Sequence, residues 1–116
     1  MSLKQILLTL LTVLLLSIGQ ILFKVASAKI DFSERGILYG VILNPTLFFA
    51  LLIYGVATIA WLLVLKDTPL RLAYPIQAIA FILVPLGAFF LLNEPLRLNT
   101  FIGAAIIIFG VYISLL

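Results

Sequence analysis

Residues 5–23 read QILLTLLTVLLLSIGQILF, nineteen consecutive residues without a charge, bounded by Lys4 and Lys24. Three further charge-free runs follow at residues 36–65, 72–93 and 98–116, with lengths of 30, 22 and 19 residues. A helix needs about 20 apolar residues to cross the hydrocarbon core of a bilayer. The sequence therefore predicts an all-α integral membrane protein with four transmembrane helices.

The composition excludes several classes of protein. Of the 116 residues, 66% are hydrophobic and 9% are charged, whereas soluble domains have about half and a quarter. The chain has no Cys and no His. This excludes disulfides, zinc sites with Cys or His ligands, and catalysis by a thiol or an imidazole. The net charge of +3 is spread over short loops, where lysines meet anionic lipid headgroups and form no nucleic-acid patch. We expect membrane lipids as partners, no cofactor, no metal and no enzymatic activity.

The boundaries of the helices follow from the charges and the prolines. Asn44-Pro45 divides the 30-residue run, because the residue before Pro leaves the α region and Pro suits a first helical turn. Gly36–Leu43 is then predicted as an interfacial or re-entrant segment. A single four-helix domain is expected, with helices at about residues 3–24, 45–65, 72–92 and 100–116.

Prolines and glycines add detail to the last two helices. Pro75 is expected in the first turn of the third helix, where its missing N–H costs nothing, and Pro85 is expected to kink the same helix in its middle. Gly103 and Gly110 are seven residues apart and share one face of the fourth helix, so a second helix could approach closely there. These two glycines are the predicted dimer interface.

The first helix carries a polar face. At 100° per residue, six of its polar residues lie within an arc of about 140°: Gln5, Thr9, Thr12, Ser17, Gln20 and Lys24. A lipid-facing helix has no use for such a stripe, so this face should point into the protein or a cavity. The alternative is that the Ser and Thr hydroxyls bond the carbonyls four residues before them.

Lys24 and Gln20 are the strongest candidates for a binding site. Lys24 lies roughly 30 Å along the helix from Lys4, and therefore at the opposite interface. It is either an anchor whose ammonium reaches the headgroups or, with Gln20 one turn deeper, a ligand for a phosphate at headgroup depth. Tyr74 and Gln77 either line a cavity or bond neighbouring helices, and Glu94 is most simply a loop charge.

No Asp, Glu, Lys, Arg or His lies near the middle of any predicted span. A proton-coupled carrier usually keeps a titratable group inside the membrane, so its absence argues against that mechanism. The basic residues are nearly balanced between the two ends of the helices, and the positive-inside rule therefore assigns no orientation.

Three stretches resemble the drug/metabolite transporter superfamily: SIGQILFK at 17–24, WLLVLKDTPLRLAYP at 61–75 and NEPLRLNTFIG at 93–103. The four-helix size is that of the small multidrug resistance proteins, which implies the same fold and a dimer. Those exporters, however, carry a glutamate where this chain has Leu16 and a tryptophan where it has Gln77. The residues on which such an exporter depends are therefore missing.

A sister branch is more similar: the subunits of the 4-amino-4-deoxy-L-arabinose-phosphoundecaprenol flippase (ArnE-like). That branch has Gly-Gln-x-x-x-Lys in its first helix, Trp-Leu-Leu-Val-Leu before Ala-Tyr-Pro, and Glu-Pro before its last helix. The resemblance implies movement of a polyprenyl-phosphate-linked monosaccharide from the cytoplasmic to the outer leaflet of a bacterial inner membrane. It also implies a homodimer, or a heterodimer with a second small four-helix subunit.

The resemblance also implies roles for the candidate residues. Gln20 and Lys24 would bind the phosphate of the glycolipid. Tyr74 and Gln77 are candidate substrate-binding residues on the separate ground that they could line a cavity. Glu94 would meet a sugar hydroxyl, an amine or Lys24 itself. Two alternatives remain: a proton-coupled exporter of small drugs or metabolites, and a non-transporting subunit of a larger membrane complex.

Overall fold

The computed structural model describes residues 2–28 and 44–116. Its elements are α1 (Leu3–Ala28), α3 (Pro45–Asp67), α4 (Leu70–Ile76), the 3₁₀ helix η1 (Gln77–Ile79), α5 (Ala80–Leu92) and α6 (Leu98–Leu115). The described residues contain no strand. The segment Gly36–Leu43, predicted as interfacial or re-entrant, lies outside the described residues.

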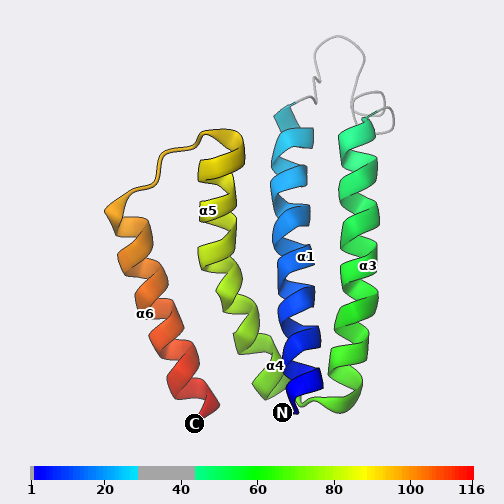
Figure 1. Ribbon diagram of the computed structural model, residues 1–116, viewed down its shortest axis with the longest axis vertical. Coiled ribbons are helices and arrows are strands. Elements are labelled where there is room, and N and C mark those ends of the chain that lie inside the picture. Colours follow the sequence, from blue (N-terminus) through cyan, green and yellow to red (C-terminus); the bar gives the residue numbers. More distant parts are fainter. Residues whose placement is uncertain (1, 29–43) are drawn as a thin grey trace.

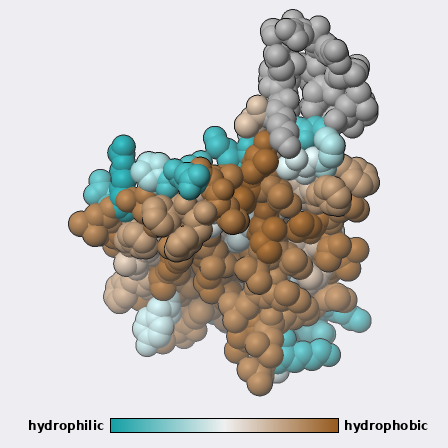
Figure 2. All heavy atoms as spheres, turned by 45° about the horizontal axis from the view of Figure 1, so that its top comes forward, coloured by the Kyte–Doolittle hydropathy of each residue, from teal (hydrophilic) through white to brown (hydrophobic). Residues whose placement is uncertain are grey.

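Four helical rods are long and apolar enough to cross a membrane, with α4, η1 and α5 together forming the third. Helices satisfy every backbone hydrogen bond within one segment, which the hydrocarbon of a bilayer requires. Figure 2 shows a broad apolar band across the molecule with polar side chains gathered at its rims. The prediction of an all-α membrane protein with four transmembrane helices is confirmed.

Helix α1 is the centre of the arrangement, with α3 on one side and α5 on the other (Figure 1). Two glycines permit this close packing. A Cβ at Gly19 would lie 2.8 Å from Cδ2 of Tyr54 on α3, and one at Gly87 of α5 would overlap Cδ1 of Ile21. Helix α6 stands apart from α5 at the end where their connection lies, comes closer to the third rod toward α4, and leaves most of its side chains exposed.

The polar face of α1 is partly buried against the rest of the protein. Thr9, Thr12 and Ser17 are almost completely covered. Their hydroxyls donate to the carbonyls four residues earlier, at distances of 2.7 to 2.8 Å: Gln5, Leu8 and Val13. Both expectations for these residues hold together, because the face points inward and the hydroxyls are satisfied by their own helix.

The α1–α3 pair is fastened at both ends by side-chain amides. At one end, Nε2 of Gln5 donates to the Asp67 carbonyl at 2.7 Å. At the other, the buried Asn44 donates from Nδ2 to the Ala26 carbonyl at 2.9 Å, while its Oδ1 accepts the N–H of Leu47 and caps α3. These two residues fix the register between the helices.

The third rod has an irregularity directly after Pro75 that the sequence did not predict. Because α4 begins at Leu70, Pro75 is its sixth residue and not part of the first turn, so its missing N–H does cost a backbone bond. The helix tightens to 3₁₀ geometry directly afterwards, at Gln77–Ile79. Pro85 lies inside α5, which continues as an α-helix on both sides of it.

Candidate functional site

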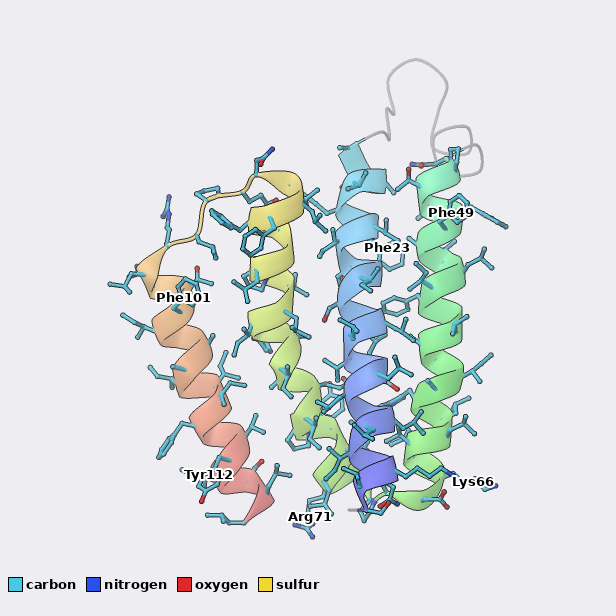
Figure 3. All side chains as sticks on the ribbon, viewed as in Figure 1. Phe23, Phe49, Lys66, Arg71, Phe101 and Tyr112 are labelled. Carbon is cyan, nitrogen blue, oxygen red and sulfur yellow. The ribbon has the colours of Figure 1, made fainter. Side chains whose placement is uncertain are left out.

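Gln20 and Lys24 lie in the last three turns of α1, and both are exposed. Lys24 lies roughly 30 Å along the helix axis from Lys4, so the two lysines belong to opposite membrane interfaces. Lys66 and Arg71 mark the end at which Lys4 lies (Figure 3). Gln20 is about 6 Å deeper than Lys24, inside the membrane-spanning part of α1 and beside Ala80 near the middle of the third rod.

An open hollow of about 470 Å³ lies beside Gln20, between α1 and α5. Its other lining residues are all apolar: Ala80, Phe81, Val84 and Pro85. We refer to these five residues as the α1–α5 groove. Gln20 is the one polar side chain in the groove, so the groove accepts a hydrocarbon chain and offers a hydrogen bond at a single point.

The Lys24 ammonium has no carboxylate within 4.0 Å among residues 2–28 and 44–116. Glu94 lies at the same end of the helices, in the connection from α5 to α6 (Figure 1). Asn93 turns the chain there with left-handed φ and ψ of 55° and 29°, and the N–H groups of Asn93 and Glu94 both donate to the Ala88 carbonyl. Lys24 and Glu94 thus share an interface without forming an ion pair.

The other two candidates are not brought to this place. Tyr74 is 63% exposed and lines a separate hollow of about 400 Å³ with Leu70, Arg71 and Pro75, near the opposite end of the protein. Gln77 is half-buried in the 3₁₀ helix η1. The structure therefore separates Tyr74 from Lys24 and Glu94 by most of the third rod, whereas Gln20 lies beside Ala80 and Pro85, near the middle of that rod.

Tyr54 of α3 is a neighbour of the site that sequence reasoning missed. Nε2 of Gln20 donates to the Tyr54 hydroxyl at 3.3 Å, and the Tyr54 ring covers Gly19. One signal in the sequence could have found it. Tyrosines of membrane proteins gather at the interfaces, whereas Tyr54 is the tenth of the 23 residues of α3, close to mid-span.

These groups suit one kind of ligand. The Lys24 ammonium, which has no carboxylate partner among the described residues, and the Gln20 amide one turn deeper can together bind an anion such as a phosphate. The adjoining groove opens to the surroundings below that level and is lined by hydrocarbon. The arrangement can therefore hold an anionic headgroup while its apolar tail stays in the membrane.

The fold defines the class first: this is a multi-pass membrane protein built from four apolar helices. No family model matches the chain, and no solved structure matches it. Curated proteins do. One from Escherichia coli O45:K1 (strain S88 / ExPEC), 42% identical over 64 residues, is named "Probable 4-amino-4-deoxy-L-arabinose-phosphoundecaprenol flippase subunit ArnE". The aligned segment covers 55% of this chain and 58% of that protein.

A second relative, from Erwinia tasmaniensis, carries the same printed name with subunit ArnF. It is 41% identical over 69 residues, which cover 58% of this chain and 54% of the relative. The chain thus matches little more than half the length of these relatives. Their names describe transport subunits, and the predicted resemblance to this flippase branch is confirmed.

Proposed function

We propose that this chain is a subunit of a flippase that moves a polyprenyl-phosphate-linked monosaccharide across a bacterial inner membrane. The observation that carries the proposal is the position of Lys24: an exposed cation without a carboxylate partner in the described chain, at the membrane interface and one turn above the α1–α5 groove. The similarity to two proteins named as flippase subunits supports it.

In this proposal the parts of the lipid are divided among the parts of the site. Lys24 attracts the phosphate by charge, and Gln20 donates an amide hydrogen to it. The first units of the polyprenyl chain lie in the α1–α5 groove, so the chain never leaves an apolar environment. Glu94, at the same interface, accepts hydrogen bonds from sugar hydroxyls or pairs with an amine on the sugar.

Two copies, or this chain and a second small four-helix subunit, complete the transporter through α6. A Cβ at Gly103 or Gly110 would meet nothing within 4 Å, so a partner helix has room to approach along this face. The exporter alternative receives less support. Every Asp, Glu, Lys and Arg of the described helices lies near a helix end, which leaves no carboxylate, amine or guanidinium of these helices at mid-membrane to exchange protons for substrate.

The test is flipping of an undecaprenyl-phosphate-linked aminoarabinose in proteoliposomes, with the protein as purified and with any small subunit that co-purifies. Lys24→Ala should abolish flipping while the protein stays folded, and Lys24→Arg should retain part of it because the positive charge remains. Lys66→Ala removes an exposed lysine from the other end and should have little effect. Flipping at the wild-type rate by Lys24→Ala would refute the proposal.

A further inference from the structure

Tyr54 is held against α1 at the depth of Gln20, one turn below Lys24. Its ring lies over Gly19, where even an added Cβ would be only 2.8 Å from Cδ2. The ring of Phe23, one turn along α1 from Gly19, lies beside the Tyr54 ring with the two centroids 5.3 Å apart and the planes inclined by 55°. Figure 3 shows Phe23 in the space between α1 and α3. The contact with the backbone of Gly19 and the contact with the ring of Phe23 therefore fix the position of the Tyr54 hydroxyl.

That hydroxyl and Gln20 form a pair with hydrogen-bonding capacity to spare. Nε2 of Gln20 donates to the Tyr54 oxygen at 3.3 Å, which leaves the phenol hydrogen available. No acceptor for this hydrogen is found in the part of the chain that the structure describes. Since each group can both donate and accept, the pair keeps a free O–H or N–H whichever of the two donates to the other.

We infer that Tyr54 is a third phosphate ligand, donating its phenol hydrogen to the same anion that Gln20 and Lys24 bind. The inference rests on the proposed function and names a binding group that the flippase resemblance does not include. A single lysine at an interface attracts any anion, whereas a neutral donor held at a set position selects one whose oxygens reach it. Because Tyr54 belongs to α3, a bound phosphate would also join the two helices.

A purely structural role for the hydroxyl would have different consequences. If the O–H served only to satisfy Gln20, its removal would change the stability of the α1–α3 pair and leave the preference for a phosphate untouched. If the O–H binds phosphate, its removal lowers the affinity for a phosphorylated lipid and not for the same chain without phosphate. The discriminating quantity is therefore a ratio of two affinities measured on one protein.

The experiment measures binding of undecaprenyl phosphate and of undecaprenol, the uncharged alcohol, to the protein in nanodiscs. Tyr54→Phe keeps the ring on Gly19 and beside Phe23 and removes only the hydroxyl. A hydrogen bond to a charged group is worth enough that we expect roughly tenfold weaker binding of the phosphate lipid. Binding of undecaprenol should not change. The matched control is Tyr112→Phe, which removes a hydroxyl from an exposed tyrosine of α6.

The possible outcomes distinguish the role of Tyr54 from the proposed function of the protein. A lost or reduced preference for phosphate in Tyr54→Phe, with Tyr112→Phe unchanged, supports the inference. An unchanged preference in Tyr54→Phe overturns it and leaves the proposed function standing. A wild-type protein that binds both lipids equally contradicts the proposed function and, with it, the role of Tyr54.

Discussion

Gly19 determines how closely α1 and α3 approach, because the Tyr54 ring occupies the place where a side chain would begin. The contact has a second effect at the next residue along the chain. With the ring in place, the Tyr54 oxygen is within reach of Gln20 at 3.3 Å. A packing contact at Gly19 therefore positions a polar group at Gln20.

Gly19→Ala should destabilise the protein by about 1–3 kcal/mol, because the new methyl group displaces the Tyr54 ring. It should also weaken binding of undecaprenyl phosphate through the displaced hydroxyl. Thermal unfolding in detergent and lipid binding in nanodiscs measure the two effects.

Gly55→Ala is the matched control, since a Cβ there meets nothing within 4 Å. It should leave stability unchanged or raise it by up to about 1 kcal/mol, as Ala loses less entropy than Gly in a helix. Equal changes in stability and lipid binding for Gly19→Ala and Gly55→Ala would show that the Gly19–Tyr54 contact contributes to neither.

Individual residues were predictable where helical periodicity alone decides their position. Gln20 and Lys24 are four apart on a confirmed helix, so their common face follows from the sequence. Tyr54 was not predictable in this way. Its position beside Gln20 depends on the register between α1 and α3, which a single sequence does not reveal.

At the scale of whole elements, Asn44 both starts α3 and ties it to α1. Asn44→Ala should cost about 2 kcal/mol or more, because α3 loses its cap and the Ala26 carbonyl loses a donor. Asn44→Ser should cost about 1 kcal/mol less, since a serine caps the helix but is too short to reach Ala26. Thermal unfolding of the wild type and the two variants separates the contribution of the helix cap from that of the hydrogen bond to Ala26. Equal losses of stability in Asn44→Ala and Asn44→Ser would contradict a capping role.

The connection between α5 and α6 depends on the left-handed conformation of Asn93, with φ of 55°. Asn93→Gly should be tolerated, because Gly adopts this conformation freely. Asn93→Val should cost about 1–2 kcal/mol, because a β-branched residue is strained there. Asn99→Val, in the first turn of α6 with ordinary helical geometry, is the control, and thermal unfolding that ranks it with Asn93→Val would refute the explanation.

The third rod shows why element details escape prediction. A difference of two residues in its start, Leu70 in place of residue 72, moved Pro75 out of the first turn. The expected cost-free proline thus became an internal one, and the tight turns at Gln77–Ile79 follow directly after it. Pro85, where a kink is predicted, lies inside α5.

For the whole molecule, α6 is the least covered of the four rods and carries the proposed dimer contact. Gly110→Leu should abolish dimerisation and leave the fold of the protomer intact, because the side chain enters open space within the chain. Gly55→Leu adds the same bulk to an open position of α3 and should leave the dimer unchanged. Fluorescence energy transfer between labelled copies in liposomes measures association, and persistent transfer in Gly110→Leu would exclude this interface.

The number of spans was predictable because bilayer thickness imposes a length on every charge-free run. The order of packing was not. All four runs are apolar on most sides, so hydropathy does not reveal that α1 would be central and α6 peripheral. Small residues, Gly19 and Gly87 among them, decide those contacts.

The openness of the α1–α5 groove has a consequence for how this protein would recognise a lipid. Phospholipids surround it on all sides, and each of them also offers a phosphate to Lys24. Which lipid occupies the groove then depends on the mole fraction of each lipid in the membrane and on its affinity for the protein. A rare lipid occupies the groove only if its affinity exceeds that of the abundant phospholipids by more than their excess in concentration. Lysine attraction is common to every competitor and cancels from that ratio. Discrimination would therefore come from the branched chain, the sugar and the neutral donors, so the residues that select the cargo would be those that carry no charge, together with Glu94.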